Sequence, residues 1–269
     1  MAKKLACILF LSMLAWVQVA YAAAEPPVAA EAAVVMNATD KRVLYAKNAG
    51  GIMYPASTTK IMTLITALEA GSPDSVVVVS PRAANCDGSS LELRNGDRLK
   101  LQEALYGMML VSGNDAAEAV AESVAGSIPA FVQKMNDEAE KIGATRTHFS
   151  NPHGLPDPIN HFTTAYDLAL ITAYGLKNPV FANIVATRDY DVHFLNRNSV
   201  THARNTNKLL NTYSGANGVK TGFTDAAGEC LVAAARRGDV ELIAVVLNSE
   251  SRWDDAARLL NYGFRQLGL

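Results

Sequence analysis

The sequence predicts an α+β fold, in which an antiparallel five-stranded sheet is flanked by helices and joined to an all-helical lobe. Three observations carry this prediction: two β-prone runs open the chain, helical patterns fill its middle, and three further β-prone runs precede a closing amphipathic stretch. Short links between consecutive strands favour antiparallel pairing, and helices must then cover the apolar faces of the sheet. The chain has 269 residues, 49% of them hydrophobic, so it can bury a sizeable core.

The first elements form a hairpin followed by helices. Ala30–Asn37 and Arg42–Tyr45 are β-prone runs around a short polar link, and this pattern predicts two antiparallel strands. An amphipathic helix is expected to start at Ser57 and to run through Leu68. Val76–Val79 is expected as a short strand. The apolar spacing predicts further helices over Leu101–Leu110, Ala116–Val124, Ile128–Ile142 and Thr164–Ala173.

The C-terminal part of the chain is expected to complete the sheet. Gly218–Thr221, Glu229–Ala235 and Glu241–Leu247 are β-prone and are separated by turn residues, which predicts a three-stranded meander. Trp253–Leu267 follows as an amphipathic helix. The N-terminal hairpin can join the meander at an edge, and a functional site is expected in the cleft between the two lobes.

The N-terminus has the anatomy of a secretory signal peptide. Two lysines precede an apolar run from Leu5 to Val19, and Ala20-Tyr21-Ala22 supplies the small residues that a signal peptidase reads. The alternative is a membrane anchor, which needs about 20 consecutive apolar residues, and this run is shorter. We therefore expect residues 1–22 to be removed, the mature protein to begin at Ala23, and the product to be exported to the periplasm or cell-wall space.

The composition argues against several partners. With a formal net charge of −2 and no block of like charges, the chain lacks the signature of a nucleic-acid-binding protein. It contains no H-E-x-x-H motif and no cluster of cysteines and histidines with the spacing of metal ligands, so no metal is expected. Cys86 and Cys230 remain after cleavage of the signal peptide. An oxidising compartment permits a bridge between them, but we expect two unpaired thiols.

Three short sequence motifs, in this order along the chain, point to a serine acyl-enzyme. They are Ser57-Thr58-Thr59-Lys60, Ser112-Gly113-Asn114 and Lys220-Thr221-Gly222. Each motif alone is more often an ordinary helix start, helix link or strand end than a functional site. All three together match the motifs of penicillin-binding proteins and class A β-lactamases.

The first motif supplies a nucleophile and a base. Ser57 and Lys60 lie three residues apart at a helix start, so their side chains share one face, and the free N–H groups there suit a developing oxyanion. A serine hydroxyl is a weak nucleophile until a base takes its proton. Lys60 can be that base only when it is neutral, which requires burial or a neighbouring cation, and Lys220 could supply that cation.

The other two motifs are expected to line the cleft. Ser112 and Asn114 can reach into it as a proton relay and as an amide ligand. Lys220 and Thr221 sit on a strand, where Gly222 lets another chain approach the backbone closely. A strand edge of this kind can pair with an extended peptide substrate.

A Ser-His-Asp enzyme is the obvious competitor. Ser57 lacks the G-x-S-x-G elbow that many such enzymes carry. The histidines are therefore interpreted as loop or packing residues; they are His148, His153, His161, His193 and His202.

The segments around the three motifs resemble the corresponding segments of low-molecular-mass penicillin-binding proteins, the D-alanyl-D-alanine carboxypeptidases. The resemblance covers about residues 27–267 and rests on Tyr54–Thr63, Ser112–Ala117, Phe149–Leu155 and Lys220–Thr224. It implies a β-lactamase/transpeptidase-like fold and no metal or organic cofactor. It also implies peptidoglycan stem peptides as substrates and β-lactams as covalent inhibitors.

The resemblance implies a role for each site residue. Ser57 would attack the carbonyl of the penultimate D-alanine, Lys60 would take the proton, and Ser112 would relay it toward the leaving amine. The backbone N–H groups of Ser57 and Phe223 would form the oxyanion hole, and Arg252 would neutralise the substrate carboxylate. The implied substrate-binding residues are Asn114, Lys220, Thr221, Gly222, Phe223 and Arg252.

Three other functions compete with this one. A class A β-lactamase needs a glutamate that activates water, and residues 142–173 contain none. A non-catalytic penicillin-sensing or wall-binding module would usually have lost a catalytic residue, whereas here the set is complete. A DD-endopeptidase that cleaves peptidoglycan cross-links uses the same residues and is kept as the alternative.

The resemblance also bears on the domain organisation. We expect residues 23–269 to form a single catalytic domain. Larger members of the family continue into a β-rich module and an amphipathic anchor, whereas this sequence stops just after its closing helix. No stable membrane anchor is therefore expected.

Overall fold

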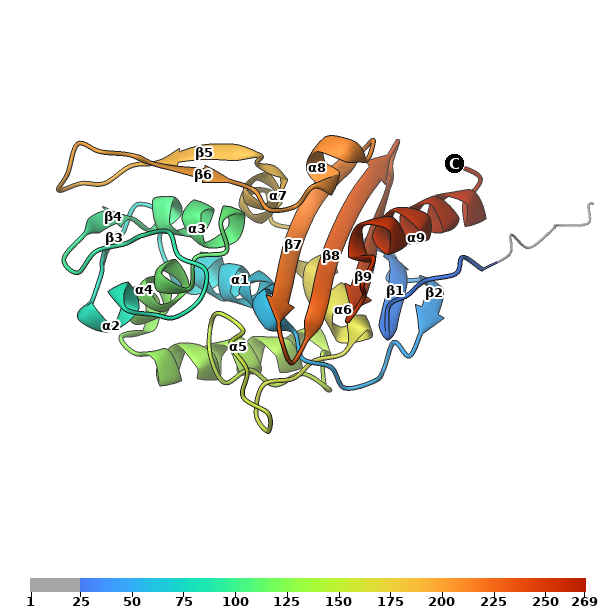
Figure 1. Ribbon diagram of the computed structural model, residues 1–269, viewed down its shortest axis with the longest axis horizontal. Helices are drawn as coiled ribbons and strands as arrows, with labels where there is room; N and C mark the ends of the chain where they lie inside the picture. The colour runs from blue at the N-terminus through green and yellow to red at the C-terminus, as the bar shows by residue number, and fades with distance from the viewer. Residues whose placement is uncertain (1–24) are drawn as a thin grey trace, which may run out of the picture.

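One five-stranded antiparallel sheet lies at the centre of the α+β fold (Figure 1). The computed structural model describes residues 25–269, so the predicted signal peptide and its cleavage site before Ala23 lie outside the described residues. The strand order is β2-β1-β9-β8-β7. The predicted hairpin and meander are both confirmed, and β1 joins them by pairing with β9. The strands are β1 (Ala32–Asn37), β2 (Val43–Lys47), β7 (Ala216–Thr224), β8 (Gly228–Arg237) and β9 (Val240–Leu247).

The central strands are buried on both faces. Val245 of β9 pairs with Val34 of β1 and Val232 of β8, and all three side chains belong to the core shared with the helical lobe. The next residue, Val246, faces the other side and packs with α9 (Arg252–Gln266). Because side chains alternate along a strand, a strand covered on both faces must be apolar on both, as β9 is from Leu242 to Leu247.

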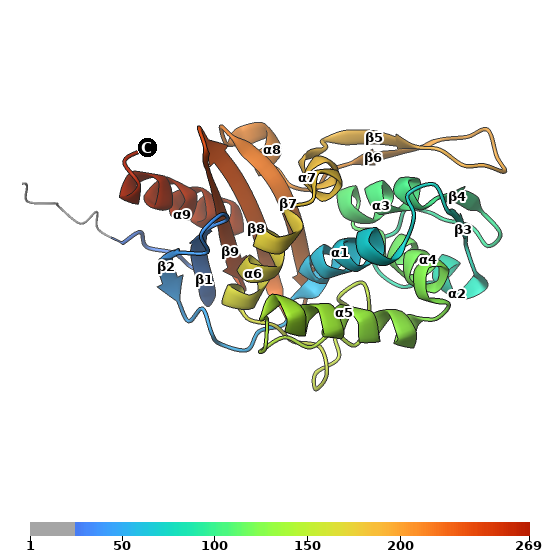
Figure 2. The ribbon, with the colours of Figure 1, turned by 180° about the vertical axis from the view of Figure 1, so that it is seen from behind.

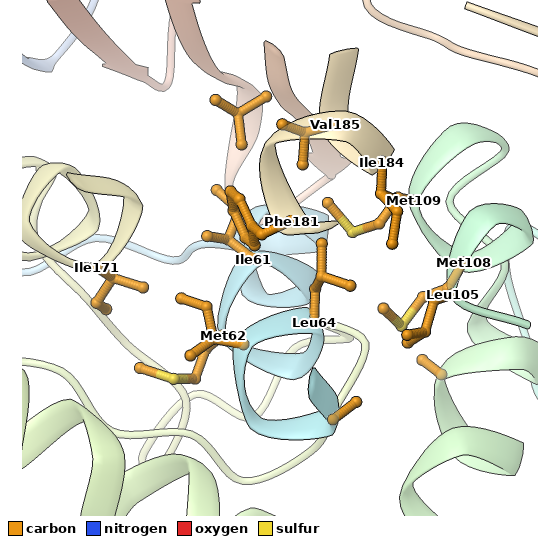
Figure 3. Packing of buried hydrophobic residues seen from close by; sticks show 14 of the residues in the cluster. Ile61, Met62, Leu64, Leu105, Met108, Met109, Ile171, Phe181, Ile184 and Val185 are labelled. Carbon is orange, nitrogen blue, oxygen red and sulfur yellow. The ribbon is translucent and has the colours of Figure 1, made fainter. Parts of the chain in front are cut away.

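Helices cover the face of the sheet opposite α9 and continue beyond it as the helical lobe (Figures 1 and 2). α1 (Lys60–Ala70) lies at the centre of this lobe, and its buried Ile61, Met62 and Leu64 point toward side chains of the surrounding helices (Figure 3). Full burial of each such side chain contributes about 1.5–3 kcal/mol, so α1 is firmly held. The other long helices are α3 (Leu101–Leu110), α4 (Asn114–Ala125), α5 (Ile128–Ile142), α6 (Ala165–Gly175) and α7 (Pro179–Ala186).

Within residues 25–269, no single helix has both the length and the apolar composition of a membrane span. The helices α6 and α7 reach that composition only as a pair, which is bent by 114°.

The structure differs from the sequence prediction in its short elements. Ser57 lies in a 3-10 turn, η1 (Ala56–Thr59), so the predicted α-helix start at Ser57 is wrong by one turn. Short elements held by distant partners were not predicted, and β5 is an example, because its Tyr190 stacks on Tyr106 of α3 with ring centroids 3.8 Å apart. The unpredicted short elements are α2 (Pro81–Ala84), β4 (Arg98–Lys100), β5 (Asp189–Val192), β6 (Thr201–Arg204) and α8 (Leu209–Thr212). The longer helix α7 was not predicted either. The predicted short strand is β3 (Val76–Val78), which pairs with β4.

Candidate active site

Ser57 lies where the edge strand β7 passes the start of the helical lobe. Ala56, directly before it, has a left-handed backbone with φ 47°. Such a conformation costs a non-glycine residue about 1–3 kcal/mol, so the surrounding packing must hold it. Gly222 of β7 is part of that packing, since a Cβ on Gly222 would stand 3.1 Å from the Ser57 nitrogen. The sequence predicts that another segment approaches Gly222 closely, and in the structure that segment is the turn that carries Ser57.

The side chain of Lys60 connects the first sequence motif, which contains Ser57, to the second, which contains Asn114. It is fully buried, and its Nζ atom has three hydrogen-bond partners. These are the Ser57 Oγ atom at 3.1 Å, the Asn114 Oδ1 atom at 2.7 Å and the backbone oxygen of His153 at 2.8 Å. The structure thus brings together the predicted nucleophile, the predicted base and the predicted amide ligand.

The hydrogen-bond partners of Lys60 define the direction of its lone pair. A neutral amine has two N–H donors and one lone pair. The backbone oxygen of His153 can only accept, and so can the Oδ1 atom of Asn114, whose Nδ2 atom donates to the Asp87 oxygen at 2.6 Å. Two N–H groups are therefore used, and the lone pair of a neutral Lys60 points at the Ser57 hydroxyl.

The electrostatics favour a neutral Lys60. Burial lowers the pKa of Lys60 well below its usual value, and the nearby charge of Lys220 lowers it further. Burial also lowers the pKa of Lys220 to about 7, with a smaller contribution from Arg252. Lys220 donates to the Thr221 backbone oxygen at 3.0 Å. When it is protonated, Lys220 therefore supplies the neighbouring cation that the sequence predicts beside Lys60.

Ser112 is buried at the junction of α3 and α4. Its backbone is left-handed, with φ 65°, and it is not among the three hydrogen-bond partners of Lys60. The buried carboxylate of Asp115 holds this junction, because it accepts hydrogen bonds from the Leu91 and Leu93 nitrogens at 2.9 and 3.0 Å. Asp115 was not predicted as a site residue, although an acidic residue in the first turn of a helix was a visible signal.

Strand β7 presents the remaining predicted residues along the edge of the sheet. The Thr221 hydroxyl shares a hydrogen bond of 2.7 Å with the hydroxyl of Thr206. The side chain of Phe223 is 59% exposed, so it is available to a ligand. Arg252 donates to the Gly222 oxygen, which places its guanidinium beside the strand. All the predicted substrate-binding residues of β7 and α9 therefore lie around one edge.

His153 has more contacts than the loop or packing role expected for it. Its backbone oxygen binds Lys60, and its Nε2 atom lies 3.5 Å from the Oε1 atom of Glu118. His161 fits the packing role better, because burial lowers its pKa to about 3 and its Nε2 atom shares a 2.8 Å hydrogen bond with Thr59. No sequence signal linked His153 or Glu118 to Lys60, since the three residues are distant along the chain.

Three residues near Lys60 have the ligand types of a metal site. Ligand atoms of Cys86, Glu118 and His153 lie within 4.8 Å of one another. The His153 Nδ1 atom accepts a hydrogen bond from the Leu155 nitrogen at 3.2 Å, so the neutral ring carries its proton on Nε2 and directs it at Glu118. A metal ion would need the lone pair of Nε2, and this arrangement therefore does not fit one.

Both cysteines in the described part of the chain are free thiols, which confirms the sequence prediction. Cys86 is half-buried, and Cys230 is buried in β8. Burial raises the pKa of Cys86 to about 12 and that of Cys230 to about 11, so both are protonated and unreactive near neutral pH.

Comparisons with known proteins agree with this geometry. A profile of the D-alanyl-D-alanine carboxypeptidase family of peptidases matches residues 19–251. The D-alanyl-D-alanine carboxypeptidase DacF of Bacillus subtilis is 36% identical over 245 residues, which cover 88% of this chain and 62% of that protein. The chain thus spans less than two thirds of this relative.

Solved structures extend the match to the fold. The crystal structure of a Streptomyces DD-transpeptidase superposes with a TM-score of 0.85 at 35% identity, covering 90% of this chain and 99% of that one. A D-alanyl-D-alanine carboxypeptidase from Mycobacterium tuberculosis superposes with a TM-score of 0.86 at 33% identity, covering 91% of this chain and 95% of that one. The chain therefore belongs to the D-alanyl-D-alanine carboxypeptidase family of serine peptidases.

Proposed function

We propose that the protein is a serine-type D-Ala-D-Ala carboxypeptidase, which removes the terminal D-alanine from peptidoglycan stem peptides through an acyl-enzyme. One observation carries this proposal: the hydroxyl of Ser57 lies 3.1 Å from the amine of a fully buried Lys60, whose N–H groups have other acceptors. The names of the Bacillus and Mycobacterium relatives support the same reaction.

The proposed reaction starts at Ser57. Its Oγ atom attacks the carbonyl carbon of the penultimate D-alanine while the Nζ atom of Lys60 takes the hydroxyl proton. The backbone N–H groups of Ser57 and Phe223 hold the resulting oxyanion. The peptide C–N bond then breaks, Ser112 relays a proton to the leaving amine, and free D-alanine departs. Water hydrolyses the ester and restores Ser57.

The proposed substrate lies extended along the outer edge of β7. β7 is the last strand in the sheet order, so an added peptide strand can pair with it there. Asn114 would hold a peptide amide, and Lys220 and Thr221 would bind the substrate next to the strand. Arg252 would pair with the terminal carboxylate, which its position beside Gly222 supports.

The proposed setting follows from the substrate. Stem peptides lie outside the cytoplasmic membrane, in accordance with the predicted export of the chain to the periplasm or cell-wall space. β-Lactams would acylate Ser57 in place of the peptide and remain as slowly hydrolysed esters. The proposed reaction uses side chains and backbone groups of this chain alone.

Digestion of defined muropeptides tests the proposal. The purified protein is incubated with pentapeptide monomers, cross-linked dimers and an added amine acceptor, and the products are read by mass. Loss of one D-alanine supports the carboxypeptidase. Conversion of dimers to monomers would instead indicate the DD-endopeptidase, and a new amide product would indicate acyl transfer, as the name of the Streptomyces neighbour describes. No product from the folded protein would overturn all three, with Ser57→Ala as the blank.

A further inference from the structure

A buried carboxylate near Lys60 has no part in the reaction described above. Glu118 lies on α4, one helical turn after Asn114 and on the same face. Its Oε2 atom accepts a hydrogen bond from the Arg82 Nε atom at 3.1 Å, and its Oε1 atom lies 3.5 Å from the His153 Nε2 atom. Burying a carboxylate costs free energy unless such donors surround it, so the presence of Glu118 beside the site calls for an explanation.

Glu118 helps to hold the ring of His153 in one orientation. The ring is clamped from two sides, because its Nδ1 atom accepts from the Leu155 nitrogen and its Nε2–H group faces Glu118. The ring is also buried, and burial lowers the pKa of His153 despite the opposing effect of Glu118, so the ring is neutral near pH 7. With both nitrogens occupied, the ring cannot rotate without losing an interaction.

The backbone of the same residue binds the base. The His153 oxygen accepts from the Lys60 Nζ atom at 2.8 Å, and Asn114 supplies the other acceptor at 2.7 Å. Glu118 therefore connects the two elements that carry these acceptors: its own helix carries Asn114, and its carboxylate holds the loop that carries His153. The relative position of the two acceptors decides where the lone pair of Lys60 points.

We propose that Glu118 is a positioning residue for acylation, which holds the His153 carbonyl and the Asn114 amide so that the lone pair of Lys60 is directed at Ser57. This inference rests on the proposed acyl-enzyme function and deepens it. Glu118 touches none of the reacting atoms and acts only through His153 and its own helix.

Acylation kinetics with a fluorescent penicillin test the role. The rate of the acylation step is measured separately from the dissociation constant of the initial complex. Glu118→Ala frees the His153 ring, and a misdirected base should slow the acylation step by about tenfold to 100-fold with little change in the dissociation constant. Glu118→Gln keeps an acceptor for the His153 N–H group and should restore most of the rate.

A matched control separates this effect from the general cost of losing a buried glutamate. Glu138 on α5 is as buried as Glu118 and pairs with Lys141 at 3.0 Å, but it lies near the far end of α1. Glu138→Ala should leave the acylation step unchanged. An unchanged acylation step in Glu118→Ala would overturn the proposal.

The pH profile gives a readout that a purely structural role would not move. The titratable or charged groups around the Lys60 amine are Lys220, Cys86, Asp115, His153 and His161, and Glu118 lies behind His153. Glu118→Ala and Glu118→Gln lose the same charge, but only Glu118→Ala weakens a carbonyl acceptor that favours the ammonium form of Lys60. The acid limb should therefore lie at lower pH in Glu118→Ala than in Glu118→Gln, with a lower plateau. A lower plateau with the limb at the same pH in both variants would overturn the proposal.

A double-mutant cycle with His153→Ala tests the pathway. If Glu118 acts through the His153 ring, Glu118→Ala should cost little more once that ring is gone, whereas additive losses would overturn the proposal. If Glu118→Ala does not fold, His153→Ala alone decides, because an unchanged acylation step there overturns it as well. Failure of the wild-type protein to bind penicillin would instead overturn the proposed function.

Discussion

Arg252 donates a hydrogen bond from its Nη1 atom to the backbone oxygen of Gly222, at 2.9 Å. This bond ties the first residue of α9 to the edge strand β7. The guanidinium also lies 3.5 Å from the carboxylate of Glu229 and over the ring of Trp253, at 4.9 Å from the ring centroid. Arg252 is thus held rigidly beside the strand on which the substrate is proposed to lie.

Arg252→Ala should weaken peptide turnover more than penicillin acylation. Loss of one partner of a hydrogen-bonded charge pair costs about 2 kcal/mol or more, and the peptide depends on its terminal carboxylate. A β-lactam draws part of its reactivity from ring strain and should tolerate the loss better. Both kcat/KM for a D-Ala-D-Ala peptide and the penicillin acylation rate are measured. Arg258→Ala, an exposed arginine on the same helix, is the control, and equal losses in both assays would make Arg252 structural.

Ser57→Ala should abolish labelling by fluorescent penicillin without unfolding the protein, because the nucleophile is removed and little packing is lost. Lys60→Arg should have nearly the same effect, since a guanidinium stays charged and cannot act as the base. Gel fluorescence measures the labelling, and circular dichroism checks the fold. Persistent labelling that peptide mapping assigns to another serine would contradict the assignment of Ser57.

The free energy of unfolding should rise with pH between about 7 and 10.5 because of Lys220. Its pKa is about 7 in the folded protein, against 10.5 as the usual value, so in this range the unfolded chain binds a proton that the folded protein has lost. Below pH 7 both states are protonated, and the cost of burying the charge is fully present. One such group contributes up to about 1.4 kcal/mol per pH unit.

Urea unfolding at several pH values measures this dependence, with Lys220→Met as the comparison. The variant should show a smaller rise with pH, because it has no proton to lose. Lys60 acts in the same direction, and its pKa should rise once the Lys220 charge is removed, so its own contribution to the rise also becomes smaller in the variant. Equal slopes in the two proteins would mean that Lys220 keeps its usual pKa.

Gly222→Ala should slow acylation by about tenfold while the protein stays folded. The added Cβ would stand 3.1 Å from the Ala56 Cβ atom, the Pro55 oxygen and the Ser57 nitrogen, so β7 and the nucleophile turn must move apart by a few tenths of an ångström. Gly50→Ala is the control, because its Cβ meets only the mobile end of Arg146. The penicillin acylation rate of each variant is compared with wild type. A wild-type rate in Gly222→Ala would show that this contact does not limit the site.

The mature protein should begin at Ala23, because Ala20 and Ala22 supply the small residues that a signal peptidase reads. The intact mass of the protein recovered outside the cytoplasm checks the cleavage site. A species that keeps residues 1–22 and fractionates with the membrane would indicate an anchor instead.

Local patterns were enough for the long elements and for the proximity of Ser57 and Lys60. The predicted bounds Leu101–Leu110 and Ile128–Ile142 agree with α3 and α5, because helical periodicity and the flanking residues are properties of a continuous segment. The pairing of Ser57 with Lys60 follows from their spacing of three residues, which a single turn of chain brings together.

Contacts between distant segments decided the rest. Lys60 finds the two acceptors of its N–H groups 54 and 93 residues away, at Asn114 and His153, and only the packing of α1 against α4 and the loop before α6 brings them together. The short turn at Ser57 is likewise set by Gly222 from the far end of the chain. A sequence pattern records which side chains are apolar and how they repeat, whereas the direction of a lone pair depends on the relative placement of three segments, which is fixed only when they pack into one core.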